Sequence, residues 1–346
     1  MHVLGRRSGP GAGPAARLGT YRAPDGSDGA PVALDLDGPH VGLVVGKRGY
    51  GKSYTLGVLA EGAARADGVA PVVVDPMGAM GGLTATDAGG PARVVDRPRV
   101  RADALPAPAW PELLGLDPAG PAGGLVWLAA AECERGTLAA MRERVAAADA
   151  DDAIRRAADN HLRLAASWGV FDPDGLDPAA LCDGAATVLD CSGLDPAPAG
   201  AVVGAVARGL YAARVDGAVG RLPWLLLDEA HAFFGGAAAP ALRRLCTRGR
   251  APGVSLVAAT QRPSAVPDVA VSQADLLVAH RLTADPDVAA LARATPTYLE
   301  GGLRERLPAD PGAAVVVDDA TESVHGVRVR ERATPHRGGT PSATGP

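Results

Sequence analysis

A glycine-rich loop followed by a lysine and a serine carries the clearest chemistry in the sequence. Residues 40–53 read H-V-G-L-V-V-G-K-R-G-Y-G-K-S, so the pattern G-x-x-x-x-G-K-S runs from Gly46 to Ser53. Glycines let successive backbone N–H groups turn toward one anion, and a helix start adds a favourable dipole. Lys52 can then reach the terminal phosphates, and the Ser53 hydroxyl can bind Mg²⁺. The loop predicts a site for a nucleoside triphosphate, with ATP and Mg²⁺ as cofactors.

The segments on either side of the loop support this interpretation. The apolar run 41–45 predicts a strand before it, and residues 54–61 predict a helix after it. A glycine-rich turn with a chance lysine would require neither of them. We therefore assign the whole loop to nucleotide binding: Gly46, Lys47, Arg48, Gly49, Tyr50, Gly51, Lys52, Ser53 and Tyr54.

Two adjacent carboxylates follow a second apolar run. Residues 224–227 precede Asp228 and Glu229. An aspartate at the end of a buried strand can hold Mg²⁺, and the glutamate beside it can orient and deprotonate a water molecule. Two acids at a helix start could instead cap that helix, but the apolar run and the upstream loop favour catalysis. We assign Ser53 and Asp228 to the metal and Glu229, with Lys52, to catalysis.

A further strand, predicted over 254–260, has polar groups at both of its ends. Gln261 follows it, and an amide there can sense the γ-phosphate or position water. Arg248 and Arg250 stand just before it. Surface arginines are usually solvated, but a guanidinium at this edge could complete the site of a neighbouring subunit. That role would require an oligomer.

Strand-like and helical segments alternate along the chain. Strands are expected over 31–36, 41–45, 71–75, 125–130, 187–191, 224–227, 254–260, 276–280 and, at an edge, 313–317; helices are expected over 54–61, 138–148, 154–165 and 199–215. This alternation predicts an α/β fold with a mainly parallel sheet, helices on both faces and a helical insertion at about 131–185. Residues 1–30, rich in glycine and proline, predict a flexible arm before a domain over 31–330. Residues 331–346 predict an extended tail.

Composition argues against a zinc protein and a membrane protein, but it does not identify the binding partner. The chain has 346 residues, a net charge of −5 and only 3% aromatic residues. The charge supplies no general attraction to nucleic acid. The four cysteines, Cys133, Cys182, Cys191 and Cys246, lack C-x-x-C spacing, which argues against zinc and favours reduced, buried thiols. No apolar run approaches the length of a membrane span. We expect a soluble, cytoplasmic protein.

Several stretches together resemble one family, the HerA/FtsK-type hexameric motor ATPases, and more particularly its HerA branch. The matching stretches are H-V-G-L-V-V-G-K-R-G-Y-G-K-S (40–53), V-V-V-D-P-M-G (72–78), T-V-L-D-C-S-G-L (187–194), L-L-L-D-E-A-H-A-F-F (225–234), R-G-R-A-P-G-V-S-L-V-A-A-T-Q-R-P-S (248–264) and S-Q-A-D-L-L-V-A-H-R-L (272–282). The resemblance implies a RecA-like P-loop NTPase fold and an ATP-driven homo-hexameric ring that moves or unwinds double-stranded DNA, together with a nuclease partner. It also implies that Gln261 is a sensor and that Arg250 acts in trans.

The chain departs from the family pattern at three places. The family opens with a small β-barrel, for which about forty residues before the loop are too few. Ala79 replaces a family glutamate, and Ala251 replaces a basic residue. Two other functions stay open: a motor for conjugation or secretion, and a protein that uses ATP only as a binding switch. For DNA contact the sequence offers the arginine clusters Arg142/Arg144, Arg155/Arg156 and Arg328/Arg330/Arg332, which are more typical of solvated faces.

Overall fold

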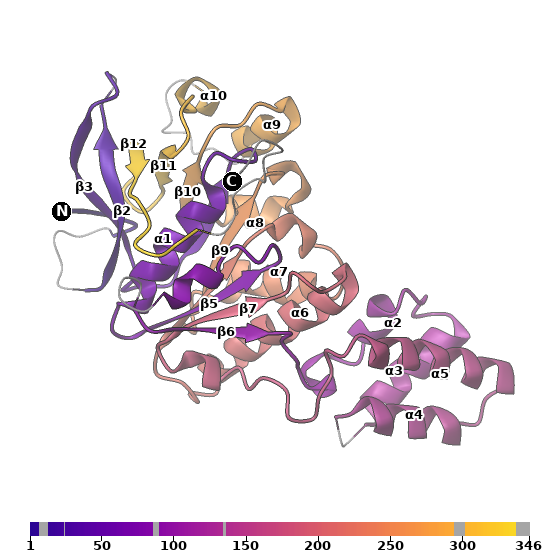
Figure 1. Ribbon diagram of the computed structural model, residues 1–346. Coiled ribbons are helices and arrows are strands. Elements are labelled where there is room, and N and C mark those ends of the chain that lie inside the picture. Colours follow the sequence, from indigo (N-terminus) through magenta and orange to yellow (C-terminus); the bar gives the residue numbers. More distant parts are fainter. Residues whose placement is uncertain (7–12, 24, 86–89, 134–135, 294–301, 337–346) are drawn as a thin grey trace, which may run out of the picture.

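One mixed sheet organises the chain (Figure 1). The computed structural model describes residues 1–6, 13–23, 25–85, 90–133, 136–293 and 302–336, and these form a 12-stranded sheet in the order β1-β3-β2-β12-β11-β10-β4-β9-β8-β5-β7-β6. From β10 to β6 each strand runs parallel to its neighbour. From β3 to β10, through β2, β12 and β11, the pairing is antiparallel. The core of the predicted α/β fold is therefore parallel, with an antiparallel extension on one side.

The elements alternate along the chain as the sequence predicts for most of its length. The strands are β1 (His2–Leu4), β2 (Ala15–Arg22), β3 (Asp28–Asp35), β4 (Val41–Val45), β5 (Val69–Asp75), β6 (Ala92–Asp96), β7 (Ala186–Asp190), β8 (Leu222–Leu227), β9 (Ser255–Thr260), β10 (Leu276–Ala279), β11 (Ala313–Asp318) and β12 (Ser323–Val329). The helices are α1 (Lys52–Ala64), α2 (Ala109–Leu113), α3 (Pro121–Ala131), α4 (Leu138–Ala147), α5 (Asp152–Ser167), α6 (Pro196–Val215), α7 (Ala239–Arg248), α8 (Asp268–Ser272), α9 (Asp285–Arg293) and α10 (Leu303–Arg306).

The central strands are buried on both faces. Val44 of β4 and Leu226 of β8 belong to the apolar core that includes residues of α1. Leu43 and Leu225, their neighbours in the chain, belong to the core on the other face, with α6 and α7. Because successive side chains of a strand point to opposite faces, a strand covered on both sides reads as an unbroken apolar run. The predicted arrangement of helices on both faces is present.

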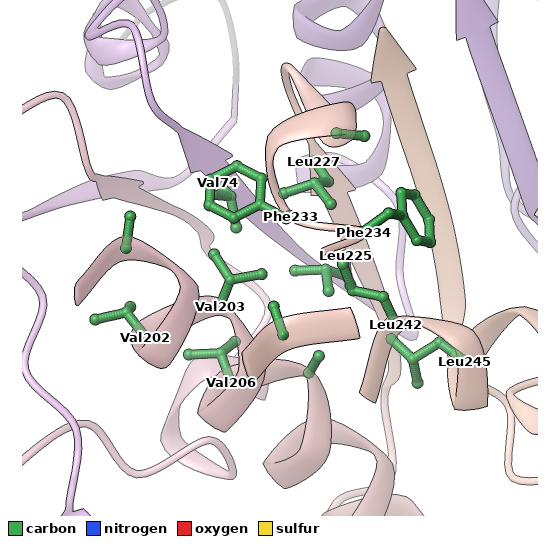
Figure 2. Close-up of a cluster of buried hydrophobic side chains, with 14 of the residues drawn as sticks. Val74, Val202, Val203, Val206, Leu225, Leu227, Phe233, Phe234, Leu242 and Leu245 are labelled. Atoms are coloured by element: carbon green, nitrogen blue, oxygen red, sulfur yellow. The ribbon is translucent and has the colours of Figure 1, made fainter. Parts of the chain in front are cut away.

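An apolar cluster fixes the strand that leads to the two acids. Figure 2 shows Leu225 and Leu227 of β8 packed near Val203 of α6 and the two phenylalanines Phe233 and Phe234, which follow the acids in the chain. All five side chains are buried. Burial of one such side chain contributes about 1.5–3 kcal/mol. The backbone is therefore anchored on both sides of Asp228 and Glu229.

The strand expected over 125–130 is a helix, and that prediction was wrong. These residues lie inside α3, where Leu125, Val126 and Ala129 are buried. Burial of positions i, i+1 and i+4 is helical spacing. Pro121 occupies the first turn of α3, where a missing N–H costs nothing. A short apolar run alone does not separate a buried strand from a helix.

The helices α2 to α5 form a lobe beside the sheet, inserted between β6 and β7 (Figure 1). The expected insertion at about 131–185 includes α4 and α5. The helices begin earlier, however, at Ala109, and the last one ends at Ser167. The lobe shares the apolar core of the face covered by α6.

The flexible arm expected over residues 1–30 contains strands instead. β2 pairs with β3 and with β12, and β1 pairs with β3. β11 is likewise not an edge strand, because it lies between β10 and β12. These predictions failed because β2 and β12 lack a continuous apolar run and become strands through pairing with distant parts of the chain. The strands before β4 extend the central sheet.

The cysteines in the structure are free thiols. Burial raises the pKa of Cys182 to about 11 and that of Cys191 and Cys246 to about 12, so these three stay protonated; Cys133 is half-buried. Among the described residues, no group of three or more histidine, cysteine or acidic side chains could hold a metal ion. None of the helices described is both long and apolar enough to cross a membrane.

Candidate nucleotide-binding site

The phosphate loop leaves β4 at Val45 and enters α1 at Lys52. A Cβ atom on Gly46 would lie 2.6 Å from the Cβ of His280, so a larger residue does not fit there. Gly51 has φ of 114°, in the left-handed region that favours glycine. The first N–H groups of α1 have no carbonyl partner within the helix, and they belong to residues that line a cavity. This geometry is compatible with the predicted anion cradle, which stays a prediction.

A buried histidine supports this loop from the neighbouring strand β10. The Nδ1–H of His280 donates to the carbonyl of Ala313 at 2.8 Å, so Nε2 accepts from the Thr55 hydroxyl at 2.9 Å. Burial lowers the pKa of His280 to about 4, so the ring is neutral at pH 7. The sequence analysis missed this role. Its available signal was that His280 is the last residue of the strand expected over 276–280.

A cavity of about 800 Å³ opens over the loop, a volume within the usual range of ligand sites. It is lined on one side by residues 48–55. The other walls come from Met77, Ala79, Glu229, Pro311, Gly312, residues 328–331 and His336. Most of the assigned loop residues, from Arg48 to Tyr54, thus face one cavity.

Asp228 directly follows β8, and its side chain is fully buried. Its Oδ1 accepts the backbone N–H of Glu229 at 2.9 Å, and the nearby Ser53 hydroxyl acts to lower the pKa of the carboxylate. Burial raises the pKa of Asp228. In the described part of the chain Oδ2 has no hydrogen-bond partner. A buried carboxylate oxygen without a partner is costly unless a cation meets it. The Ser53–Asp228 pair therefore fits Mg²⁺, which prefers oxygen ligands.

The amine of Lys52 interacts electrostatically with both acids, Asp228 and Glu229. Its side chain is buried, and Nζ donates to the carbonyl of Lys47 at 3.4 Å. Burial lowers the pKa of Lys52, whereas the charges of Glu229 and Asp228 act to raise it. The structure thus brings the lysine and the two acids together at the carboxyl ends of β4 and β8.

Glu229 adopts a strained backbone conformation at the mouth of this site. Its φ of 45° and ψ of 42° are left-handed, which costs a residue other than glycine about 1–3 kcal/mol and is typical of functional positions. Its Oε2 lies 3.4 Å from Nε2 of Gln261 and 3.3 Å from Nδ1 of His231. Burial lowers the pKa of His231, so the neutral ring dominates at pH 7. The side chains that end β8 and β9 therefore meet around one carboxylate.

Arg250 lies at the opposite ends of the parallel strands. It precedes β9, whose far end leads to Gln261. Its guanidinium pairs with Asp275 at 3.0 Å, and its side chain is 74% exposed. Within one chain Arg250 is therefore separated from the cavity by the length of β9. Its role in a neighbouring subunit's site stays a prediction.

Two of the arginines that were candidates for DNA contact are used inside the protein. Arg330 and Arg332 approach the buried carboxylate of Glu61, with only 15% and 1% of their side chains exposed. Arg328 pairs with Asp28. On the helical lobe, Arg142 pairs with Asp159 and Arg155 with Asp152. In each cluster at least one arginine is therefore paired with an acidic side chain of the same chain.

The fold is shared with solved structures of very different sequence. No protein-family model and no curated protein sequence matches the chain. The structure is similar to VirB4 of Thermoanaerobacter pseudethanolicus, with a TM-score of 0.69 and 14% identity over 93% of this chain and 98% of that one. It is similar to the unbound bacterial conjugative coupling protein TrwBdeltaN70, with a TM-score of 0.63 and 16% identity over 94% and 98% of the two chains.

A structure of the plasmid coupling protein TrwB in complex with ADP and Mg²⁺ gives a TM-score of 0.61 and 18% identity over 95% and 98% of the two chains. At such identities the likeness concerns the fold alone. The fold of this chain is the predicted RecA-like α/β fold, with a mainly parallel central sheet and a helical insertion.

Proposed function

We propose that the chain is a Mg²⁺-dependent ATPase that hydrolyses ATP to ADP and phosphate. The observation that carries this proposal is the partnerless, buried Oδ2 of Asp228 beside Ser53, in the same site as the Lys52 amine. Such a site is costly when empty of cations and becomes favourable with a metal and a polyphosphate.

The residues have separate tasks in this reaction. The loop N–H groups and Lys52 hold the β- and γ-phosphates, and Ser53 with Asp228 holds the metal. Mg²⁺, when bound, neutralises charge that develops on the phosphate oxygens. Glu229 takes a proton from water as the water oxygen attacks the γ-phosphorus and the bond to the ADP oxygen breaks. Gln261, which already lies beside Glu229, orients that water.

We infer that ATP hydrolysis drives a homo-hexameric, HerA/FtsK-type motor on double-stranded DNA. The exposed Arg250, at the strand ends opposite the nucleotide, supports contact across a subunit interface. Conjugation or secretion is supported about equally as the setting, because the similar folds belong to VirB4 and to a conjugative coupling protein. A cytoplasmic location goes with the DNA motor.

The ATPase rate with and without duplex DNA tests this function. A DNA motor turns over ATP faster when duplex DNA is present, and this stimulation weakens steeply with salt because phosphate contacts release counterions. A steady ATPase rate that DNA leaves unchanged argues for a motor on protein. If the protein binds ATP but does not hydrolyse it, the proposal is contradicted. The remaining function is then that of a protein that uses ATP only as a binding switch.

A further inference from the structure

The segment 330–336, called here the strap, runs along α1 after β12 and is fastened to one buried carboxylate. The side chain of Glu61 on α1 is fully buried. Arg330 Nη1 lies 2.8 Å from its Oε2, and the Thr334 hydroxyl donates to Oε1 at 2.6 Å. The guanidinium of Arg332 lies beside the same carboxylate, with Nε 3.7 Å from Oε1. The backbone N–H of Ala333 also donates to Oε2, at 3.2 Å, so one acid on the loop helix contacts four residues of the strap.

The Glu61 carboxylate that holds the strap stays ionised. Burial alone would raise the pKa of Glu61, but the bonds from Thr334 and Arg330 hold that pKa below its usual value. Every nitrogen of the Arg330 guanidinium has a protein partner, namely the carbonyls of Arg17, Val58 and Glu331 besides Glu61. The charges of the strap are thus balanced within the protein, and Arg330 is not a second anion site.

Two glycines make room for the strap. A Cβ atom on Gly57 of α1 would lie 2.6 Å from Cζ of Arg332. A Cβ atom on Gly82 would lie 1.9 Å from the carbonyl oxygen of Pro335. At Gly57 the Arg332 side chain occupies the space that a Cβ atom would need, and at Gly82 the strap backbone does so. The strap is therefore a fitted part of the fold.

The outer side of the strap forms an aromatic wall of the nucleotide cavity. The backbone N–H of Arg332 donates to the Tyr54 hydroxyl at 2.6 Å, and its Nη1 lies 3.1 Å from Nδ1 of His336. The rings of Tyr54 and His336 meet edge to face with centroids 5.7 Å apart. Partial burial and the Arg332 charge lower the pKa of His336, so its ring is neutral at pH 7. Both rings line the cavity.

We propose that the base of the bound nucleotide stacks against the wall formed by Tyr54 and His336, and that Glu61 positions this wall by holding the strap. This inference rests on the proposed function. Tyr54 lies two residues beyond Lys52, so phosphates held at Lys52 leave the rest of the molecule facing the wall. Rings of this kind accept the flat face of any base. Glu61, behind the strap, acts as a positioning residue.

The affinities for ATP and for inorganic tripolyphosphate, each with Mg²⁺, are measured by calorimetry. Their ratio gives the contribution of the base and sugar, because both ligands carry three phosphates. The variants are His336→Ala, Glu61→Gln and the control His2→Ala, an exposed histidine on β1. We expect the wild type to prefer ATP, and His336→Ala to weaken ATP binding about tenfold while tripolyphosphate binding is unchanged. Glu61→Gln gives the same pattern if its thermal unfolding stays cooperative.

The outcomes are distinguishable. An unchanged ratio of ATP to tripolyphosphate affinity in His336→Ala overturns the inference, as does a wild type that binds both ligands equally. His336 is exposed, so this variant tests the wall even if Glu61→Gln fails to fold. A wild type that binds neither ligand defeats the proposed function itself. A further variant, Lys52→Ala, should bind neither ligand, which would support the proposed function. The stacking wall is then judged by the His336→Ala result alone.

Discussion

Gln261 donates its side-chain N–H to Oε2 of Glu229 at 3.4 Å, so the residues that follow β9 and β8 meet at one carboxylate. We predict that Gln261→Ala lowers the rate of ATP hydrolysis about tenfold to a hundredfold, because the water-activating group loses its orienting partner. The affinity for ATP should stay within about twofold, since the loop is untouched. Steady-state kinetics and equilibrium binding check the two expectations. Gln273→Ala, an exposed glutamine at the other end of the sheet, is the control; an equal loss there would contradict the assignment.

His280 should make the protein sensitive to acid. Its pKa of about 4 in the folded chain lies below the ordinary value of 6.5, so the unfolded chain binds the proton more tightly. The stability from the neutral ring is complete above pH 6.5 and is lost as the pH falls toward 4, on the order of 1 kcal/mol per pH unit. Urea unfolding of the wild type and of His280→Asn, at pH 7.5 and 5, should show a smaller pH effect in the variant. Equal pH effects would show that His280 does not carry this proton.

His40 should act with the opposite sign. It lies between Asp35 and Asp275, at 3.4 and 3.0 Å, and these carboxylates raise its pKa to about 9 against the effect of burial. The charged ring therefore stabilises the fold fully below pH 6.5, and this contribution is lost as the pH rises through 9. The difference in unfolding free energy between the wild type and His40→Gln should be larger at pH 6 than at pH 9.5. A difference that grows with pH would contradict the ion pairs.

Arg250 offers a test of the ring. If it completes a neighbour's site, Arg250→Ala and Lys52→Ala should each lose most ATPase activity, since each removes one half of every site. Mixing the two proteins should restore part of the activity, because some interfaces then pair an intact Lys52 with an intact Arg250. Arg243→Ala, an exposed arginine on α7, is the matched control. No recovery on mixing, with mixed oligomers shown by mass measurement, would rule out action in trans.

The parts of the fold that could be predicted are those whose signal is local. Residues 41–53 carry a complete strand–loop–helix pattern, and residues 224–229 carry an apolar run that ends in two acids. These two short patterns suffice to predict both elements and the proximity of Lys52 to the acids. The partnership of Gln261 with this site likewise follows from its position after a strand.

The parts that could not be predicted depend on contacts far apart in the sequence. β12 pairs with β2, although about 300 residues separate the two strands in the sequence. The Arg332 guanidinium packs on α1 only because Gly57 has no side chain. His280 looks like any polar residue after a strand until β4 and β11 are placed beside it. Such roles arise from pairing and burial, which no local pattern encodes.

The most direct measurement concerns Glu229, whose strained backbone places its carboxylate at the mouth of the site. We predict that Glu229→Gln binds Mg²⁺–ATP as tightly as the wild type, while single-turnover hydrolysis of radiolabelled ATP falls at least about a hundredfold. This result would show that the chain is an ATPase with Glu229 as the group that activates water. Unchanged hydrolysis in Glu229→Gln, with Lys52→Ala inactive beside it, would contradict the central claim.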